Sequence, residues 1–156
     1  MPKIYHMRTF LAFLIIVSFI SCDQNTDHIG IDYHTGTFRK YLLNTFGENI
    51  PEEKHVFILL RTTVADEEYK SNMTMLNQLL EEKHTSEVTG IMSFNLQMPL
   101  ELHPPVLLKT DWDNAIDRLQ IPMDAITAIV TKNREIEDII IVRPHRKKEL
   151  QNALAE

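Results

Sequence analysis

The stretch from His55 to Lys83 constrains most strongly how this chain can fold. It opens with the nearly continuous apolar run of residues 55–61, rich in β-branched and aromatic side chains, which predicts a buried strand. Residues 66–83 follow with apolar side chains at helical spacing: Tyr69, Met73, Met75, Leu76, Leu79 and Leu80. In α/β proteins the chemistry often lies at the turn from a central strand into a helix. We therefore expect an α/β domain with any functional site beside this turn.

Four further segments predict the elements around this unit. Residues 38–46 have helical spacing and end at Gly47, a residue that commonly terminates helices. Residues 87–94 predict a second buried strand, and residues 106–109 predict a short extended piece. A helix is expected over residues 110–120, with one apolar face formed by Trp112, Ala115, Ile116 and Leu119.

The carboxyl-terminal segment predicts a hairpin and a helix. Residues 125–131 and 136–142 are apolar runs separated by the polar residues 132–135, which is typical of an antiparallel hairpin. Pro144 opens a last helix with a buried side formed by Leu150, Ala153 and Leu154. The expected fold class is therefore α/β, with a central mixed sheet, a carboxyl-terminal antiparallel hairpin and helices on both faces.

The first 22 residues have the pattern of a secretory signal. Lys3 and Arg8 form a basic start, residues 10–20 are almost wholly apolar, and a small residue precedes Cys22. This apolar run is shorter than the roughly 20 residues that span a bilayer. The end of the run, Phe19-Ile20-Ser21-Cys22, resembles the lipobox of bacterial lipoproteins, in which the cysteine is lipidated.

This resemblance implies a palmitate-carrying lipoprotein of the bacterial cell envelope, anchored at Cys22 to the inner or the outer membrane, with its domain outside the cytoplasm. Cys22 is the only cysteine, so no intramolecular disulfide can form. The expected organisation is a signal peptide at residues 1–22, a polar tether at residues 23–35 and one domain at residues 36–156. Translation can start at Met1 or at Met7, and the sequence leaves this choice open.

Charge and glycine content exclude several functional classes. The formal net charge is −6, and an acidic surface repels the phosphate backbone, so we expect no nucleic-acid partner. The chain has only four glycines, and they form no phosphate-binding or dinucleotide-binding loop. We therefore expect no cofactor.

The order of predicted elements over residues 36–156 resembles the thioredoxin-like fold, a three-layer sandwich, and especially the thioredoxin-like lipoproteins of the bacterial envelope. The redox motif of that family, Cys-x-x-Cys, follows the central strand, and its place is taken here by Asp66-Glu67-Glu68-Tyr69. The family's cis-proline would lie near Ala125, whereas the nearest proline is Pro122. Thiol–disulfide oxidoreductase activity is therefore not expected, because a thiolate is required for it.

Other chemistries have weaker signals. His28 and His34, with Asp27 and Asp32, are metal-capable side chains in the expected tether, but solvated linker residues explain them better. His55 is expected to be an exposed residue at the edge of its strand. Paired acids at residues 66–68, and at Asp111 and Asp113, are interpreted as helix caps rather than as general acids or bases. We therefore assign no catalytic residue and no metal ligand.

The leading hypothesis from the sequence is a lipid-anchored envelope protein with a redox-inactive thioredoxin-like domain, which serves as a binding or assembly module for an envelope protein partner. Two alternatives stay open. One is an enzyme that uses the carboxylates of the 66–68 turn, and the other is a solute- or metal-binding lipoprotein.

Overall fold

The computed structural model describes residues 26–61, 66–82, 86–95, 102–103 and 106–155. The expected signal peptide, Cys22 and the first residues of the expected tether lie outside the described residues. Over these residues the fold is α/β, with one five-stranded mixed sheet and three α-helices. The elements are α2 (Thr26–Phe46), β1 (His55–Leu60), α3 (Glu67–Glu81), β2 (Glu87–Ser93), β3 (Leu107–Asp111), the 3-10 helix η1 (Ala115–Arg118), β4 (Ile126–Lys132), β5 (Glu135–Ile141), the 3-10 helix η2 (Pro144–Arg146) and α4 (Lys147–Ala155).

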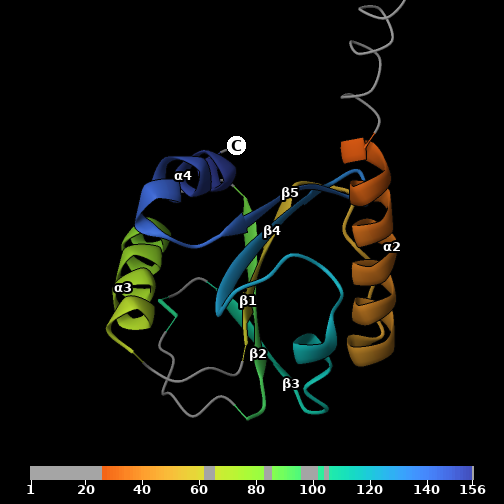
Figure 1. The fold of residues 1–156 in the computed structure, drawn as a ribbon, viewed down its shortest axis with the longest axis horizontal. Helices are drawn as coiled ribbons and strands as arrows, with labels where there is room; N and C mark the ends of the chain where they lie inside the picture. The colour runs from red at the N-terminus through yellow and green to blue at the C-terminus, as the bar shows by residue number, and fades with distance from the viewer. Residues whose placement is uncertain (1–25, 62–65, 83–85, 96–101, 104–105, 156) are drawn as a thin grey trace, which may run out of the picture.

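The strands lie in the order β3-β2-β1-β4-β5, with β1 at the centre (Figure 1). β1 pairs with β2, and β2 with β3, in parallel. The hairpin β4–β5 adds antiparallel pairs on the other side of β1. β1, β2, β3 and β5 therefore end, and β4 begins, at one edge of the sheet. We call this edge the carboxyl edge and the opposite one the amino edge.

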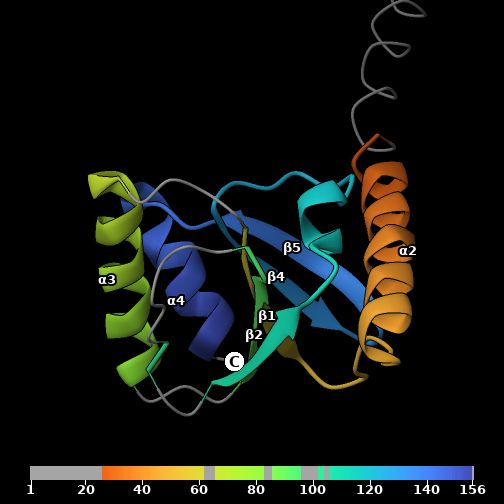
Figure 2. The same cartoon turned by 90° about the horizontal axis from the view of Figure 1, so that it is seen from below.

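Helices cover both faces of β1, which explains why every residue of this strand is buried (Figures 1 and 2). Side chains alternate between the faces of a strand, so Val56, Ile58 and Leu60 contact the core formed with α3 and α4. Phe57 and Leu59 contact the core formed with α2 and η1 on the opposite face.

The structure confirms the central strand, the helix after it, the second strand, the hairpin and the last helix. The hairpin turns at Asn133 and Arg134, which have φ of 53° and 66°. Two consecutive positive φ values suit the twist of a tight two-residue hairpin loop. Leu150, Ala153 and Leu154 are the buried residues of α4, as the sequence predicts.

The first described helix is longer than predicted. α2 begins at Thr26, so residues 26–35, expected to be tether, are helical. Tertiary contacts explain this extension. The backbone N–H of Ile136 donates to Thr35 Oγ1 at 3.0 Å, and the Tyr33 hydroxyl donates to Gln120 Oε1 at 2.8 Å. Such contacts are not visible in a periodicity of neighbouring residues.

The helix predicted over residues 110–120 is wrong. β3 extends to Asp111, and only the short η1 follows. The Asp111 side chain accepts hydrogen bonds from the backbone N–H groups of Asp113 and Ile116, and Asn114 is left-handed with φ of 52°. These local bonds replace a regular helical turn. Trp112, expected in the core, is consequently 69% exposed.

Candidate functional site

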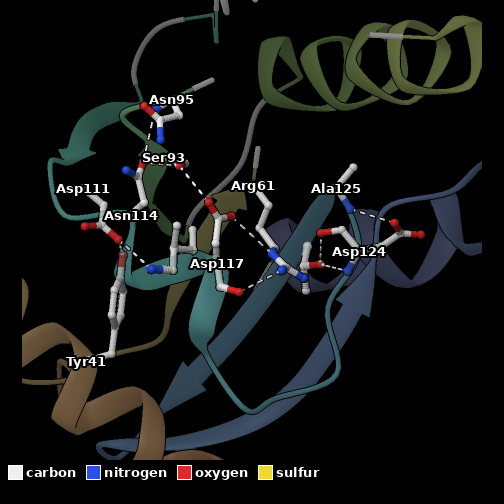
Figure 3. Close-up of polar contacts among 11 residues, drawn as sticks. Tyr41, Arg61, Ser93, Asn95, Asp111, Asn114, Asp117, Asp124 and Ala125 are labelled. Atoms are coloured by element: carbon white, nitrogen blue, oxygen red, sulfur yellow. Dashed lines mark hydrogen bonds and ion pairs between the residues drawn. The ribbon is translucent and has the colours of Figure 1, made fainter. Parts of the chain in front are cut away.

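Polar side chains line the carboxyl edge, where ligands of α/β sheets usually bind. Arg61 directly follows β1, and Ser93 and Asp111 end β2 and β3. Asp124 precedes β4, and Arg143 follows β5. Strand direction alone therefore brings five polar residues from distant parts of the chain to one edge. Figure 3 shows four of them, all but Arg143, with their contacts.

At the β3 end of this edge, Asp111 is fully buried and fully hydrogen-bonded. Its Oδ2 accepts from the Tyr41 hydroxyl at 3.1 Å and from the Ile116 N–H at 2.7 Å, and its Oδ1 accepts from the Asp113 N–H at 3.2 Å. Burial, followed by the nearby Asp111 charge, raises the pKa of Tyr41 far above its ordinary value. Tyr41 therefore keeps its proton and remains a donor. Asp111 fastens α2 and η1 to β3 (Figure 3).

Next to it, Ser93 joins the ends of β2 and η1. Its Oγ lies 2.5 Å from Asn114 Oδ1 and 3.1 Å from Asp117 Oδ2. Arg61 Nη2 donates to the Asp117 carbonyl oxygen at 3.0 Å, and Arg61 Nε lies 3.5 Å from Asp117 Oδ1. Ser93 is fully buried, so a substrate cannot reach its hydroxyl. This network (Figure 3) is structural and contains no accessible nucleophile.

At the β5 end, Asp124 is paired with Arg143. Arg143 Nη2 donates to Asp124 Oδ2 at 2.5 Å, and the Ala125 N–H donates to Asp124 Oδ1 at 2.8 Å. The Arg143 hydrogen bond and, after it, the Ala125 hydrogen bond lower the pKa of Asp124. The carbonyl oxygen of Ala125 accepts from the Arg61 N–H at 3.0 Å, which joins this loop to the end of β1.

The acidic turn predicted as the degenerate family site starts α3. Asp66 is the N-cap, and its Oδ1 accepts from the Tyr69 N–H at 2.8 Å. Glu67 pairs with Lys70 at 2.7 Å, and Glu67 and Glu68 are exposed in the first helical turn. Acids here interact favourably with the helix dipole.

A small pocket of about 140 Å³ lies between this turn, the start of β4 and the segment that follows β5. Its lining consists of Asp66, Glu68, Tyr69, Asn72, Asp124, Ala125, Ile126, Val142 and Arg143. The Tyr69 hydroxyl and Asn72 Oδ1 are both buried here without a hydrogen-bond partner, and so is Arg143 Nε, which lies 3.9 Å from Glu68 Oε1. Burial raises the pKa of Tyr69 to about 12. Most buried polar groups are hydrogen-bonded, so two unpartnered neutral groups in one pocket indicate space for a ligand group.

Of the four residues predicted at this turn, the structure brings Asp66, Glu68 and Tyr69 to the pocket, whereas Glu67 pairs with Lys70. Asn72, Asp124 and Arg143 also line the pocket and were not predicted. A signal for Asn72 existed: it is a polar residue three positions after Tyr69, on the buried side of an amphipathic helix. No sequence signal joins Asp124 to Arg143, because the fold of the hairpin creates that pair.

Other predicted residues lie elsewhere. Asp111 and Asp113 were expected to start a helix, but Asp111 ends β3 and is buried. His55 was expected to be exposed; it is only 7% exposed, at the amino edge. His34 and Asp32 lie on α2, and within the described part of the chain no three acidic, histidine or cysteine residues are placed to hold a metal ion.

Among the described helices, none is long and apolar enough to cross a membrane. The chain matches no protein-family model, no curated protein and no solved structure.

Proposed function

We propose that this protein is a lipid-anchored protein of the bacterial envelope, with a thioredoxin-like domain that binds a partner and performs no thiol chemistry. The lipobox-like residues 19–22 motivate the anchor, with Cys22 as the lipidated residue. The acids at the turn after β1, in the place of the redox cysteines, motivate the loss of redox activity.

The order of elements supports the thioredoxin-like assignment. A central strand, β1, is followed by α3 and the parallel strand β2, and an antiparallel hairpin and the helix α4 complete the chain. α3 and α4 contribute to the same core on one face, whereas α2 and η1 lie on the other (Figures 1 and 2). One departure from the family is that its proline, expected near Ala125 directly before β4, is absent, and the nearest proline is Pro122.

The single observation that carries the binding role is the pair of unpartnered buried groups, the Tyr69 hydroxyl and Asn72 Oδ1. A donor and an acceptor left unsatisfied in this way destabilise the free protein by about 1–3 kcal/mol each. A bound group that donates to Asn72 Oδ1 and forms a hydrogen bond with the Tyr69 hydroxyl, which can donate or accept, reduces this penalty. Such groups are expected where a protein has been shaped for a ligand rather than for maximal stability.

The size and charge of the pocket indicate what binds. A volume of about 140 Å³ is smaller than a cofactor site and suits the end of one side chain. Three acids, Asp66, Glu68 and Asp124, line it against one base, Arg143. We therefore propose that a partner protein inserts a basic or hydroxyl-bearing side chain, with the acids favouring a positive charge.

The carboxylate-enzyme alternative has less support. Its acids should be buried beside a substrate cavity, where desolvation adjusts them for proton transfer. Asp66 instead caps α3, and Glu67 and Glu68 extend into solvent. The exposed acids fulfil the ordinary role of residues in a first helical turn.

Labelling with radioactive palmitate tests the anchor. We expect label in the wild-type protein and none in Cys22→Ala. Ser21→Ala is the matched control, because it keeps a small residue before the cysteine and should be labelled normally. Unchanged labelling of Cys22→Ala would contradict the anchor. Insulin reduction by the purified protein should not exceed the uncatalysed rate, and clear acceleration would contradict the loss of redox activity.

Site-specific photocrosslinking in cells tests the binding role. A photoreactive residue replaces Glu68 at the rim of the pocket or, as a control, the exposed Glu137 on β5. We expect a discrete adduct from position 68 only, and its loss when Tyr69→Phe and Asn72→Leu are added. An adduct at position 68 that persists in the double variant would contradict binding through the pocket, as would equal adducts at both positions.

A further inference from the structure

A second and larger cavity opens at the amino edge, on the face of the sheet that carries α2. Its volume of about 470 Å³ lies within the range of about 300–1,000 Å³ typical of small-molecule sites. Its walls come from β1, β2, β3 and the loop after α2: Glu48, Asn49, Pro51, His55, Phe57, Ser86, Glu87, Val88, Thr89, Leu107 and Lys109. Because η1 is only one short turn, no helix covers this part of β2 and β3 among the described residues. Leu107 is consequently 59% exposed.

His55, Ser86 and Thr89 are the buried polar residues of this cavity, and His55 is the one that carries a titratable group. Its Nε2 lies 2.9 Å from Thr89 Oγ1, and its ring contacts Phe57 with centroids 4.4 Å apart. Its Nδ1 is buried without a hydrogen-bond partner, and the nearest carboxylate oxygen, Glu87 Oε2, is 3.6 Å away. That separation is too long for a hydrogen bond. One ring nitrogen of a buried histidine therefore faces a cavity unsatisfied.

The protonation state of His55 defines what this nitrogen can do. Burial lowers the pKa of His55, against the opposing influence of Glu87 and with the help of Lys109, so the ring is neutral near pH 7. A neutral imidazole has one N–H donor and one acceptor nitrogen. We assign the ring proton to Nε2, which then donates to Thr89 Oγ1 and leaves Nδ1 as an acceptor. A ligand must then bring a donor to it.

The surrounding charges select among donors. Lys109 is paired with Glu48, and Glu87 contributes a further negative charge, so the cavity is negative overall. The carboxylate of a ligand placed at Nδ1 would lie against Glu87 and be repelled. An alcohol can satisfy Nδ1 but gains nothing from Glu87. An ammonium group has hydrogens for both Nδ1 and Glu87 Oε2, and is also attracted by the carboxylate.

We propose that this cavity binds a small amphipathic primary amine, with its ammonium group between His55 Nδ1 and Glu87 and its apolar body against Phe57 and Leu107. The site is separate from the carboxyl edge and independent of the function proposed there. The amine arrives at the exposed side of β3, because Leu107 and Glu87 form the accessible rim of the cavity.

Titration of the purified protein with three probes of similar shape tests this proposal. Phenethylamine, 2-phenylethanol and 3-phenylpropionate share the aromatic body and differ in charge. Two-dimensional NMR at pH 7 follows each titration. Phenethylamine should shift the signals of His55, Thr89 and Leu107, and these shifts should reach saturation as its concentration rises. The alcohol should bind more weakly, and the carboxylate should not bind. Equal binding of phenethylamine and 3-phenylpropionate would overturn the proposal, as would shifts confined to residues outside the cavity.

Two variants identify the contacts without endangering the fold. The Glu87 side chain is 87% exposed, so Glu87→Gln should fold normally. This variant should lower the affinity for phenethylamine by about threefold and leave the affinity for 2-phenylethanol unchanged. Leu107→Ser should weaken both probes. Leu43→Ser is its matched control, because Leu43 is similarly exposed on α2 but does not line the cavity. An affinity for phenethylamine that Glu87→Gln leaves unchanged would refute the ammonium contact.

Discussion

The carboxyl edge has a buried tyrosine at each of its two ends, and the hydroxyl groups of the two tyrosines differ in their hydrogen bonding. At the closed end, next to β3, the Tyr41 hydroxyl donates to the fully buried Asp111. At the open end, between α3 and the hairpin, the Tyr69 hydroxyl has no partner, and neither has Asn72 Oδ1. Both phenols are protonated near neutral pH, because burial raises the pKa of each. The two tyrosines therefore differ in partners rather than in ionisation.

This difference separates stability from binding. A satisfied hydrogen bond contributes only about 0.5–1.5 kcal/mol net, but a buried group left without a partner costs about 1–3 kcal/mol. The closed end joins three strands, α2 and η1 through hydrogen bonds and so holds the edge rigid, and Arg61 Nε is the one buried atom of this network without a hydrogen-bond partner. The open end keeps unsatisfied groups next to a cavity, which reduces the stability of the free protein and leaves room for a ligand.

The largest effect is expected from Asp111→Ala at the closed end. The change leaves the Tyr41 hydroxyl and the Ile116 N–H buried without their acceptor, which should lower the free energy of unfolding by about 3 kcal/mol. Chemical denaturation monitored by circular dichroism measures it. Asp111→Asn keeps one side-chain acceptor and should lose clearly less. Equal losses in both variants would show that Asp111 acts through volume and not through its hydrogen bonds.

Tyr41→Phe should have an intermediate effect. It removes one donor from Asp111 Oδ2 but leaves the Ile116 and Asp113 bonds in place. The expected loss in the free energy of unfolding is about 1–2 kcal/mol, because a hydrogen bond to a charged group is worth more than a neutral one. The same denaturation experiment measures it. A neutral result would remove the distinction between the closed end and the open end.

Tyr69→Phe is the matched change at the open end and should leave stability unchanged or raise it by up to about 1 kcal/mol. No hydrogen bond is lost, and a desolvated hydroxyl is removed from an apolar helix face. The variant should lose adducts in the crosslinking experiment while its unfolding midpoint stays the same or rises. A destabilisation as large as that of Tyr41→Phe would mean that the Tyr69 hydroxyl has a structural role.

The same contrast explains which parts of the fold the sequence predicted. β1 and α3 are visible because their burial follows local periodicity, namely a continuous apolar run and an i, i+3, i+4 stripe. The prediction of a helix over residues 110–120 is wrong because the Asp111 side chain accepts a hydrogen bond from Tyr41, 70 positions away in the sequence. The same side chain accepts hydrogen bonds from N–H groups of the loop that follows it. The buried state of His55 likewise depends on Thr89 of the neighbouring strand.

The candidate site was predictable in position but not in composition. The strand–helix turn at residues 66–69 follows from the order of elements, and Tyr69 and Asp66 are indeed in the pocket. The opposite wall comes from Asp124 and Arg143, which a hairpin in the correct register brings together. Pairing across 19 residues is a property of the folded sheet, and no local pattern of charge or hydrophobicity encodes it.

The smallest effect is expected at the rim of the open end, from Arg143→Gln. The Arg143 hydrogen bond is the main reason why the pKa of Asp124 lies below its ordinary value, so the variant should raise that pKa, as followed by the carboxyl carbon shift of Asp124 in NMR. A carboxylate whose pKa is lower in the folded state stabilises the fold at pH values above its unfolded-state pKa. This contribution is lost as the pH falls through the folded-state pKa. At pH 7 the free energy of unfolding of the wild type should therefore exceed that of the variant only slightly, because both side chains are nearly half exposed and solvent screens the pair.

Acidification below the folded-state pKa of Asp124 should remove this difference. Arg118→Gln is the matched control, since Arg118 is exposed and donates to a backbone carbonyl instead of Asp124. It should leave the Asp124 titration unchanged. If the two arginine variants shift the Asp124 titration equally, the pKa of Asp124 is set by the summed charges along the carboxyl edge. The hydrogen bond between Asp124 and Arg143 would then not be its main cause.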